Sequence, residues 1–174
     1  MGLQLIICVE TNKANQSDWI YVKETLNHYY ERSVEFKYSP VFMDGKSKYN
    51  STSVKREITS LIKKYKAASR DNLSQVVLVV DTDNYDSDPV DLRLYDDINE
   101  YCRKQGYRTV WCCKDIERVY LDKKVSDKEK KAEAEKFKRK RMIKSLDISR
   151  LDCARTKNNT CNILCVLSDY LKRK

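Results

Sequence analysis

Two patterns of hydrophobic and polar positions alternate along the chain. Apolar runs without period-2 alternation cover residues 3–9 and 75–80, as is typical of strands buried on both faces of a parallel sheet. Residues 107–113 form a further predicted strand. Residues 34–38 alternate between apolar and polar side chains, and Pro40 follows, which indicates an edge strand.

Between the strands, apolar residues recur at helical spacing, which predicts helices over residues 17–30, 51–65, 90–105 and 114–121. Ser17 or Asp18 is the expected cap of the first helix. Asp88 and Pro89 are a start signal for the third helix, and Gly106 ends it.

The order of these elements predicts an α/β fold with an open, mostly parallel sheet of about four strands flanked by helices. We assign residues 1–121 to this core and residues 122–174 to a basic helical extension. Residues 122–145 read as a solvated or protruding helix, and residues 160–171 as an apolar helix that packs on the core. That apolar helix would equally suit a homodimer or a partner protein.

Composition narrows the classes of function. The 174 residues carry a formal net charge of +9, which favours an anionic partner such as nucleic acid. The chain has three glycines and neither a P-loop nor a dinucleotide-binding motif. Its seven cysteines include no C-x-x-C pair, so we expect reduced thiols that pack in the core rather than a zinc site.

We expect a cytoplasmic protein that does not enter a membrane. No apolar run reaches the roughly 18 residues that a membrane span needs. The apolar start of the chain is too short for a signal peptide.

Acidic residues stand where two of the predicted strands end. Glu10 follows the first strand, and Asp81 and Asp83 end the strand over residues 75–80. If these strands are neighbours, the three carboxylates converge and repel one another. Carboxylate oxygens suit Mg²⁺ or Mn²⁺, which would relieve the repulsion and could act on a phosphodiester. Asp86 and Asp88 read instead as part of the helix start.

An apolar strand that ends in Glu10 and a later strand that ends in Asp81-Thr-Asp83 resemble the Toprim (topoisomerase–primase) domain, in particular small RloB-like and OLD-nuclease-related proteins. The resemblance covers roughly residues 3–121 and implies a Toprim/Rossmann-like fold. It implies that Glu10 is a general acid/base or a metal ligand and that Asp81 and Asp83 bind Mg²⁺. Relatives also carry an acidic residue after the fourth strand, which makes Glu117 a further expected metal ligand. Toprim proteins usually have Gly directly after the Glu, whereas this chain has Thr11.

Basic residues supply candidate contacts to the phosphate backbone. The candidates are Lys13, Lys136, Lys138, Arg139, Lys140 and Arg141. The alternative is that residues 123–144 form a solvated helix in which Glu/Lys pairs only add helicity.

The sequence therefore predicts Mg²⁺-dependent phosphodiester chemistry on DNA or RNA. The most specific form is a Toprim-type nuclease, which the resemblance links to phage defence. The competing prediction is a non-catalytic module that binds nucleic acid or protein, which the departure at Thr11 favours. A receiver or phosphatase is not expected, because those classes need their acidic pair after the first strand, and here the Asp-x-Asp ends the third.

Overall fold

The computed structural model describes residues 2–174. The strands are β1 (Leu3–Val9), β2 (Phe36–Phe42), β3 (Leu73–Asp81) and β4 (Arg108–Cys112). The α-helices are α1 (Ser17–Tyr29), α2 (Thr52–Ala68), α3 (Pro89–Gln105), α4 (Ile116–Leu121), α5 (Lys130–Arg139) and α6 (Ile163–Leu167). Short 3₁₀ turns are η1 (Lys46–Lys48), η2 (Met142–Ser145) and η3 (Ile148–Arg150).

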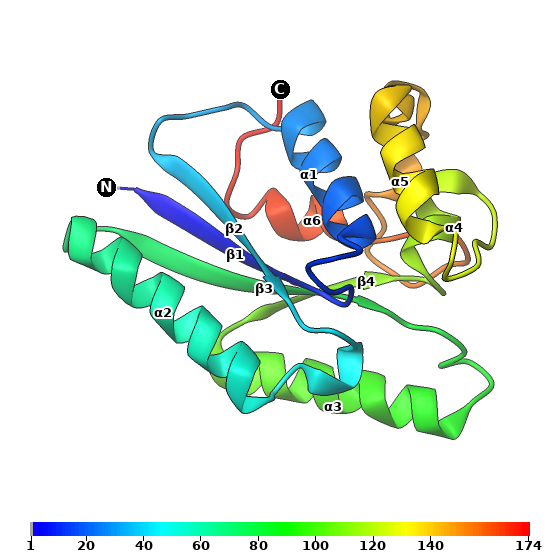
Figure 1. Ribbon diagram of the computed structural model, residues 1–174, viewed down its shortest axis with the longest axis horizontal. Coiled ribbons are helices and arrows are strands. Elements are labelled where there is room, and N and C mark those ends of the chain that lie inside the picture. Colours follow the sequence, from blue (N-terminus) through cyan, green and yellow to red (C-terminus); the bar gives the residue numbers. More distant parts are fainter. Residues whose placement is uncertain (1) are drawn as a thin grey trace.

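The strands form one four-stranded parallel sheet in the order β2-β1-β3-β4 (Figure 1). This arrangement confirms the predicted α/β class with a Rossmann-like, parallel sheet. β1 lies between β2 and β3 and pairs with both along its length, from Leu3 opposite Phe36 and Leu73. The two strands that end in acidic residues are therefore direct neighbours.

Helices cover both faces of the sheet (Figure 1). On one face, α1, α4, α5 and α6 enclose a core that includes Leu5, Ile7 and Val79. On the other, α2 and α3 enclose a second core that includes Ile6 and Leu78. Because successive side chains of a strand point to opposite faces, the inner parts of the central strands β1 and β3 are apolar, as predicted. The buried Gln4 of β1 is the polar exception, and its side-chain amide donates to the Ser39 hydroxyl at 2.9 Å.

The third helix begins and ends as the sequence predicts. The Val90 N–H donates to the Asp88 carboxylate at 2.8 Å, and Pro89 occupies the first turn. Gly106 ends the helix with φ = 69°, in the left-handed region where glycine is favoured. Asp115 caps the short helix α4 in the same way, accepting from the Arg118 N–H at 2.8 Å.

The edge strand lies later in the chain than predicted. β2 covers Phe36–Phe42 rather than residues 34–38, and it is at the edge of the sheet as Pro40 indicated. The Phe36 N–H donates to the Ser33 carbonyl at 3.1 Å, so the preceding residues form a turn. β2 then continues to Phe42 because its partner β1 runs on to Val9.

The prediction of a protruding helix over residues 122–145 is wrong. The helical part is only α5, and it packs against α1 with Ala134 and Phe137 fully buried. The Phe137 ring lies 5.2 Å from that of Tyr21 and 5.6 Å from that of Tyr120, centroid to centroid. Ala134 and Phe137, on one face of α5, pack this largely charged helix onto the core. The division at residue 121 stays a prediction, although the extension belongs to the same core cluster.

The last helix is shorter than predicted. The sequence indicated residues 160–171, but α6 covers only Ile163–Leu167. Cys161 forms an antiparallel bridge with Cys112, and the Cys113 N–H donates to the Thr160 carbonyl at 2.9 Å. Thr160 and Cys161 therefore extend along β4 instead of belonging to the helix. Ile163 and Leu164 of this short helix are buried in the core cluster that lies on the α1 face of the sheet.

Phe137→Ala should destabilise the protein by about 3–5 kcal/mol, because it leaves a cavity beside the rings of Tyr21 and Tyr120. Urea unfolding measures this free energy. The control is Lys138→Ala, one residue along on the exposed side of α5, which should change it by less than about 0.5 kcal/mol. Equal stability of the two variants would contradict the packing of α5.

Candidate carboxylate site

Glu10 and Asp81 meet where β1 and β3 end. The Asp81 backbone N–H donates to a carboxylate oxygen of Glu10 at 2.6 Å. The Asp81 carboxylate accepts from the Ile116 N–H at 3.0 Å, at the start of α4. The predicted convergence of these two acidic residues is what the strand order produces, because parallel neighbours end at the same edge.

Asp18 is a third acidic residue at this edge, although the sequence predicted only that it or Ser17 caps the first helix. That assignment is wrong, since residue 16 precedes α1 without a side-chain cap and Asp18 lies inside the helix. Its carboxylate is buried and accepts from the Thr11 N–H at 3.1 Å and the Ser17 hydroxyl at 3.2 Å. Thr11 therefore ties the loop after β1 to Asp18.

Glu117 lies on α4 with 1% of its surface exposed. Neither carboxylate oxygen has a hydrogen-bond partner in another residue among residues 2–174. The Lys130 ammonium, from α5, lies 3.8 Å from one of these oxygens. A buried acidic group with so few partners is costly to ionise and marks a site where something else could satisfy it.

A pocket of about 390 Å³ opens at this edge. Its walls come from the loop after β1, the start of α1, the loop after β2 and the segment that leads into α5. The acidic residues that line it are Glu10, Asp18, Asp44, Asp81 and Asp127. Lys130 is the basic residue in its lining. Thr11 Oγ1 and Asn15 Oδ1 belong to lining residues, are buried and lack hydrogen-bond partners within the described chain.

Asp83 does not join the pocket. Its φ of 48° turns the chain there, and its N–H donates to the Lys114 carbonyl at 2.8 Å. Its carboxylate forms an ion pair with Lys46 of η1, which also donates to the Asp81 carbonyl at 3.1 Å. Lys46 is thus a second lysine at the site that sequence reasoning missed.

Burial raises the pKa values of the clustered carboxyl groups. Burial, followed by the Asp18 charge, raises the pKa of Glu10 to about 8. Burial, followed by the Glu10 charge, raises the pKa of Asp81 well above its usual range. Burial raises the pKa of Glu117 to about 7 and also raises that of Asp18.

Lys130 offsets part of this negative charge. Burial acts to lower the pKa of Lys130, but Glu117, Asp81 and Asp18 together raise it, so the ammonium stays charged. Burial also acts to lower the pKa of Lys46, but the hydrogen bond and charge of Asp83, together with the charges of Glu10 and Asp91, raise it overall. The site thus combines two lysines with four buried or half-buried carboxyl groups, and its net charge is negative when all of these groups are ionised. The groups are Lys46, Lys130, Glu10, Asp18, Asp81 and Glu117.

The donor chemistry of the pocket fits a hard divalent cation. Its oxygen donors include two carboxylates, Glu10 and Asp81, and the unpartnered oxygens of Thr11 and Asn15. Among residues 2–174, no group of three or more His, Cys, Asp or Glu side chains is arranged to hold a metal ion. Mg²⁺ does not need such a cage, since it binds through one or two carboxylates, waters and substrate phosphates.

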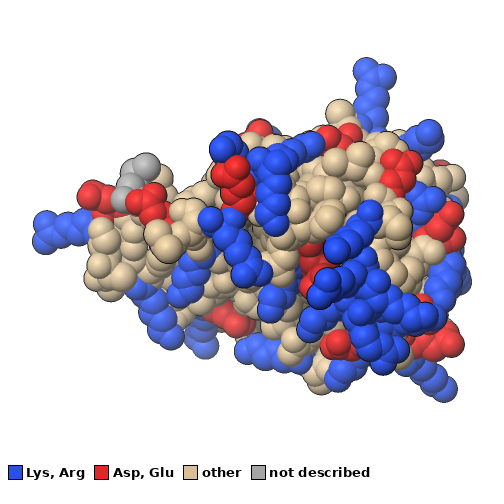
Figure 2. Space-filling view, turned by 90° about the horizontal axis from the view of Figure 1, so that it is seen from above, with Lys and Arg blue, Asp and Glu red and all other residues tan. Residues whose placement is uncertain are grey.

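The predicted phosphate contacts divide into two that pair with a carboxylate and four that do not. Lys13 pairs with Glu57 on α2 at 3.6 Å, and Lys136 pairs with Glu133 at 3.5 Å. The residues without a carboxylate partner in the described chain are Lys138, Arg139, Lys140 and Arg141, all exposed at the end of α5. Figure 2 shows Lys and Arg side chains gathered over this end of the molecule, with a few acidic groups between them.

Comparison with known proteins gives no further guide. No family model, curated protein or solved structure matches the chain significantly. Within residues 2–174, no helix combines the length and apolar character that crossing a membrane requires.

The protein should lose stability as pH rises from about 5 to 8 in EDTA. The folded pKa values of Glu10 and Glu117 lie above the usual 4.5, so the native state binds more protons than the unfolded state in this window. The loss should be a few kcal/mol. Glu117→Gln should flatten the fall in denaturation curves measured at several pH values.

Glu100→Gln is the matched control. Glu100 is fully exposed, and its hydrogen bond to Lys104 lowers its pKa, so it titrates below this window. If Glu117→Gln left the pH slope of stability as steep as Glu100→Gln does, the buried carboxyl of Glu117 would not be the titrating group.

Proposed function

We propose that the protein is a Toprim-type enzyme of phosphodiester chemistry on nucleic acid, most simply a Mg²⁺- or Mn²⁺-dependent nuclease. The observation that carries this proposal is the pairing of β1 with β3, which joins Glu10 to Asp81 in one pocket. With it we propose the cytoplasmic, phage-defence setting that the resemblance to RloB-like proteins implies.

Glu10 and Asp81 are the residues that would hold the cation, with Asp18 behind them. A bound divalent cation supplies two things to phosphodiester hydrolysis: it stabilises charge on phosphate oxygens, and it lowers the pKa of water. The arrangement of the two side chains supports this role, because the Asp81 N–H holds the Glu10 carboxylate and the Ile116 N–H holds the Asp81 carboxylate at the sheet edge. Pre-positioned ligands reduce the entropy lost on binding.

Glu117 and Lys130 form a second pair that can handle a proton. A carboxyl group with a pKa of about 7 can hold a proton or release it near neutral pH, as general acid–base catalysis requires. Lys130 lines the pocket, and its ammonium lies 3.8 Å from the Glu117 carboxylate. The lysine therefore couples the charge of Glu117 electrostatically to the carboxylates of the pocket. We therefore move Glu117 from the expected metal ligands to a proton-holding role.

The exposed basic residues at the end of α5 support nucleic acid as the substrate. α5 begins at the pocket with Lys130, and its last turn leads to the unpaired residues 138–141. α5 runs from the pocket away from the sheet edge (Figure 1), so a polyanion bound at residues 138–141 would reach the pocket along this helix.

A second candidate function is a non-catalytic module that binds nucleic acid or protein. The observation in its favour is that Asp83 pairs with Lys46 instead of lining the pocket, so the Asp-x-Asp motif contributes one carboxylate to it, not two. Thr11 in place of glycine points the same way. Such a module would bind its partner equally well in EDTA.

Glu10→Gln and Asp81→Asn should each lower Mn²⁺-dependent cleavage of labelled DNA or RNA by roughly 100-fold or more. Both changes keep the oxygen that accepts a backbone hydrogen bond, so the fold should be retained. A gel assay with both nucleic acids, with and without EDTA, measures the rate.

Asp86→Asn is the control, because Asp86 belongs to the same acidic loop but pairs with Lys114 at 3.8 Å and lies outside the pocket. It should cleave like the wild type. Cleavage by the Glu10 and Asp81 variants at the rate of Asp86→Asn, or binding without any cleavage by the wild type, would favour the non-catalytic module.

A further inference from the structure

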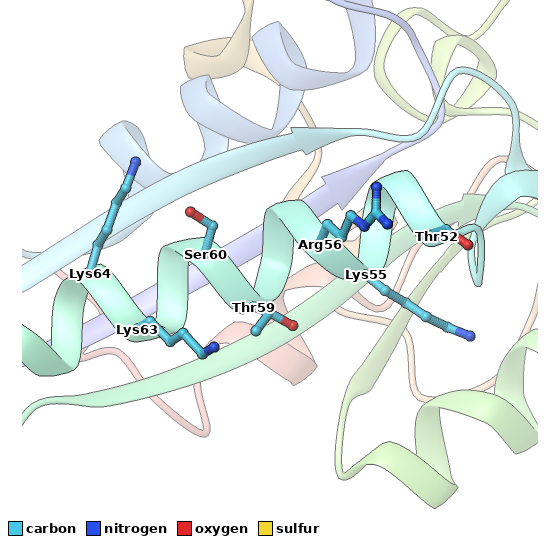
Figure 3. A pocket seen from close by; sticks show the side chains of 7 residues that line it. All are labelled: Thr52, Lys55, Arg56, Thr59, Ser60, Lys63 and Lys64. Carbon is cyan, nitrogen blue, oxygen red and sulfur yellow. The ribbon is translucent and has the colours of Figure 1, made fainter.

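A second charged surface lies on the outer face of α2, on the side of the sheet opposite to α5 (Figure 1). A shallow hollow of about 500 Å³ runs along this helix. Figure 3 shows its basic side chains spaced along α2, with Lys55 and Arg56 in the first turns and Lys63 and Lys64 further on. Three hydroxyl residues, Thr52, Thr59 and Ser60, complete the lining.

The four basic residues of this surface are not neutralised by the protein. All four are exposed, and no carboxylate lies within ion-pair distance of them in the described chain. The acidic residue of α2, Glu57, lies outside the lining and pairs with Lys13 instead. The α2 surface therefore offers hydrogen-bond donors and positive charge without an opposing carboxylate, which suits an anion.

The length of the surface favours a polymer over a single small anion. From Thr52 to Lys64 the helix rises about 18 Å, at 1.5 Å per residue. Lys55 and Arg56 are separated from Lys63 and Lys64 by about two turns, with Thr59 and Ser60 between them. Side chains of Lys, Arg, Ser and Thr are the groups that bind the phosphates of nucleic acids.

The lining also indicates which polyanion fits. It contains no aromatic side chain on which unpaired bases could stack, as single-strand binding surfaces use. It contains no large apolar side chain that could enter a lipid surface, as amphipathic membrane helices use. What remains is contact with the backbone of a duplex, which needs charge and hydroxyl groups alone.

We propose that the exposed face of α2 binds the phosphate backbone of duplex nucleic acid. This inference rests on the proposed function in that it assigns a binding surface to the same substrate class. α2 begins four residues after η1, whose Lys46 contacts Asp81 and Asp83. A duplex that lies along α2 thereby reaches the edge of the sheet where the carboxylates are.

The test is a binding titration of labelled duplex DNA and duplex RNA over a range of salt concentrations, in EDTA so that no cleavage occurs. The variant carries Lys55→Gln, Arg56→Gln, Lys63→Gln and Lys64→Gln. Its affinity should fall at least about tenfold for one duplex type, with a shallower salt dependence, because fewer counterions are released. A second variant, Lys55→Arg, Arg56→Lys, Lys63→Arg and Lys64→Arg, should bind like the wild type.

The matched control removes the same charge elsewhere, through Lys23→Gln, Arg70→Gln, Arg103→Gln and Arg155→Gln, all at exposed positions. It should bind within about twofold of the wild type. If it weakens binding as much as the α2 variant, only net charge matters and the inference is overturned. Wild-type binding by the α2 variant, or binding of the wild type to anionic phosphatidylserine vesicles but to neither duplex, also overturns it.

The two proposals fail separately. If the α2 variant loses binding while the wild type shows no Mn²⁺-dependent cleavage, the α2 surface stands and the nuclease proposal does not. If the wild type cleaves and the α2 variant binds and cleaves equally well, the nuclease proposal stands and the α2 surface does not. Thermal unfolding of both glutamine variants confirms that they are folded.

Discussion

The parallel pairing of β1 with β3 is the constraint on which the site depends. An acidic residue stands at the end of each strand, and parallel neighbours end at the same edge of the sheet. Glu10 and Asp81 therefore lie side by side. The short bond from the Asp81 N–H to Glu10 then locks that contact. β2 and β4, on either side, bring Lys46 and the α4 residue Glu117 to the same edge.

The charges of the carboxyl groups at this edge are partly offset by a lysine from α5. Burial makes the ionised forms of Glu10, Asp81 and Glu117 unfavourable, and two lysines reduce that cost without cancelling it. Lys130 comes from α5, the helix whose Phe137 fills the core beside Tyr21 and Tyr120. The extension is therefore part of the site as well as of the core, and the negative charge that remains is what the proposed cation would offset.

Local signals in the sequence predicted much of this and missed the rest for physical reasons. The uninterrupted apolar run before Asp81 was enough to predict a buried strand, and Asp88, Pro89 and Gly106 marked the ends of α3. The roles of Asp18 and Lys46 depend on where loops fold back in space. The sequence alone does not distinguish an aspartate that caps a helix from one that is buried at a site. In the structure, the hydrogen bond from the Thr11 N–H shows that Asp18 has the second role.

The measurement that tests the central claim most directly is calorimetric titration of the apo protein with Mn²⁺ at pH 7, in two buffers of different ionisation enthalpy. If the buried carboxyls form a cation site, one ion binds and protons are released, because Glu10 must give up the proton that its raised pKa retains. Absence of binding at millimolar Mn²⁺, or binding with no proton release, would contradict the account.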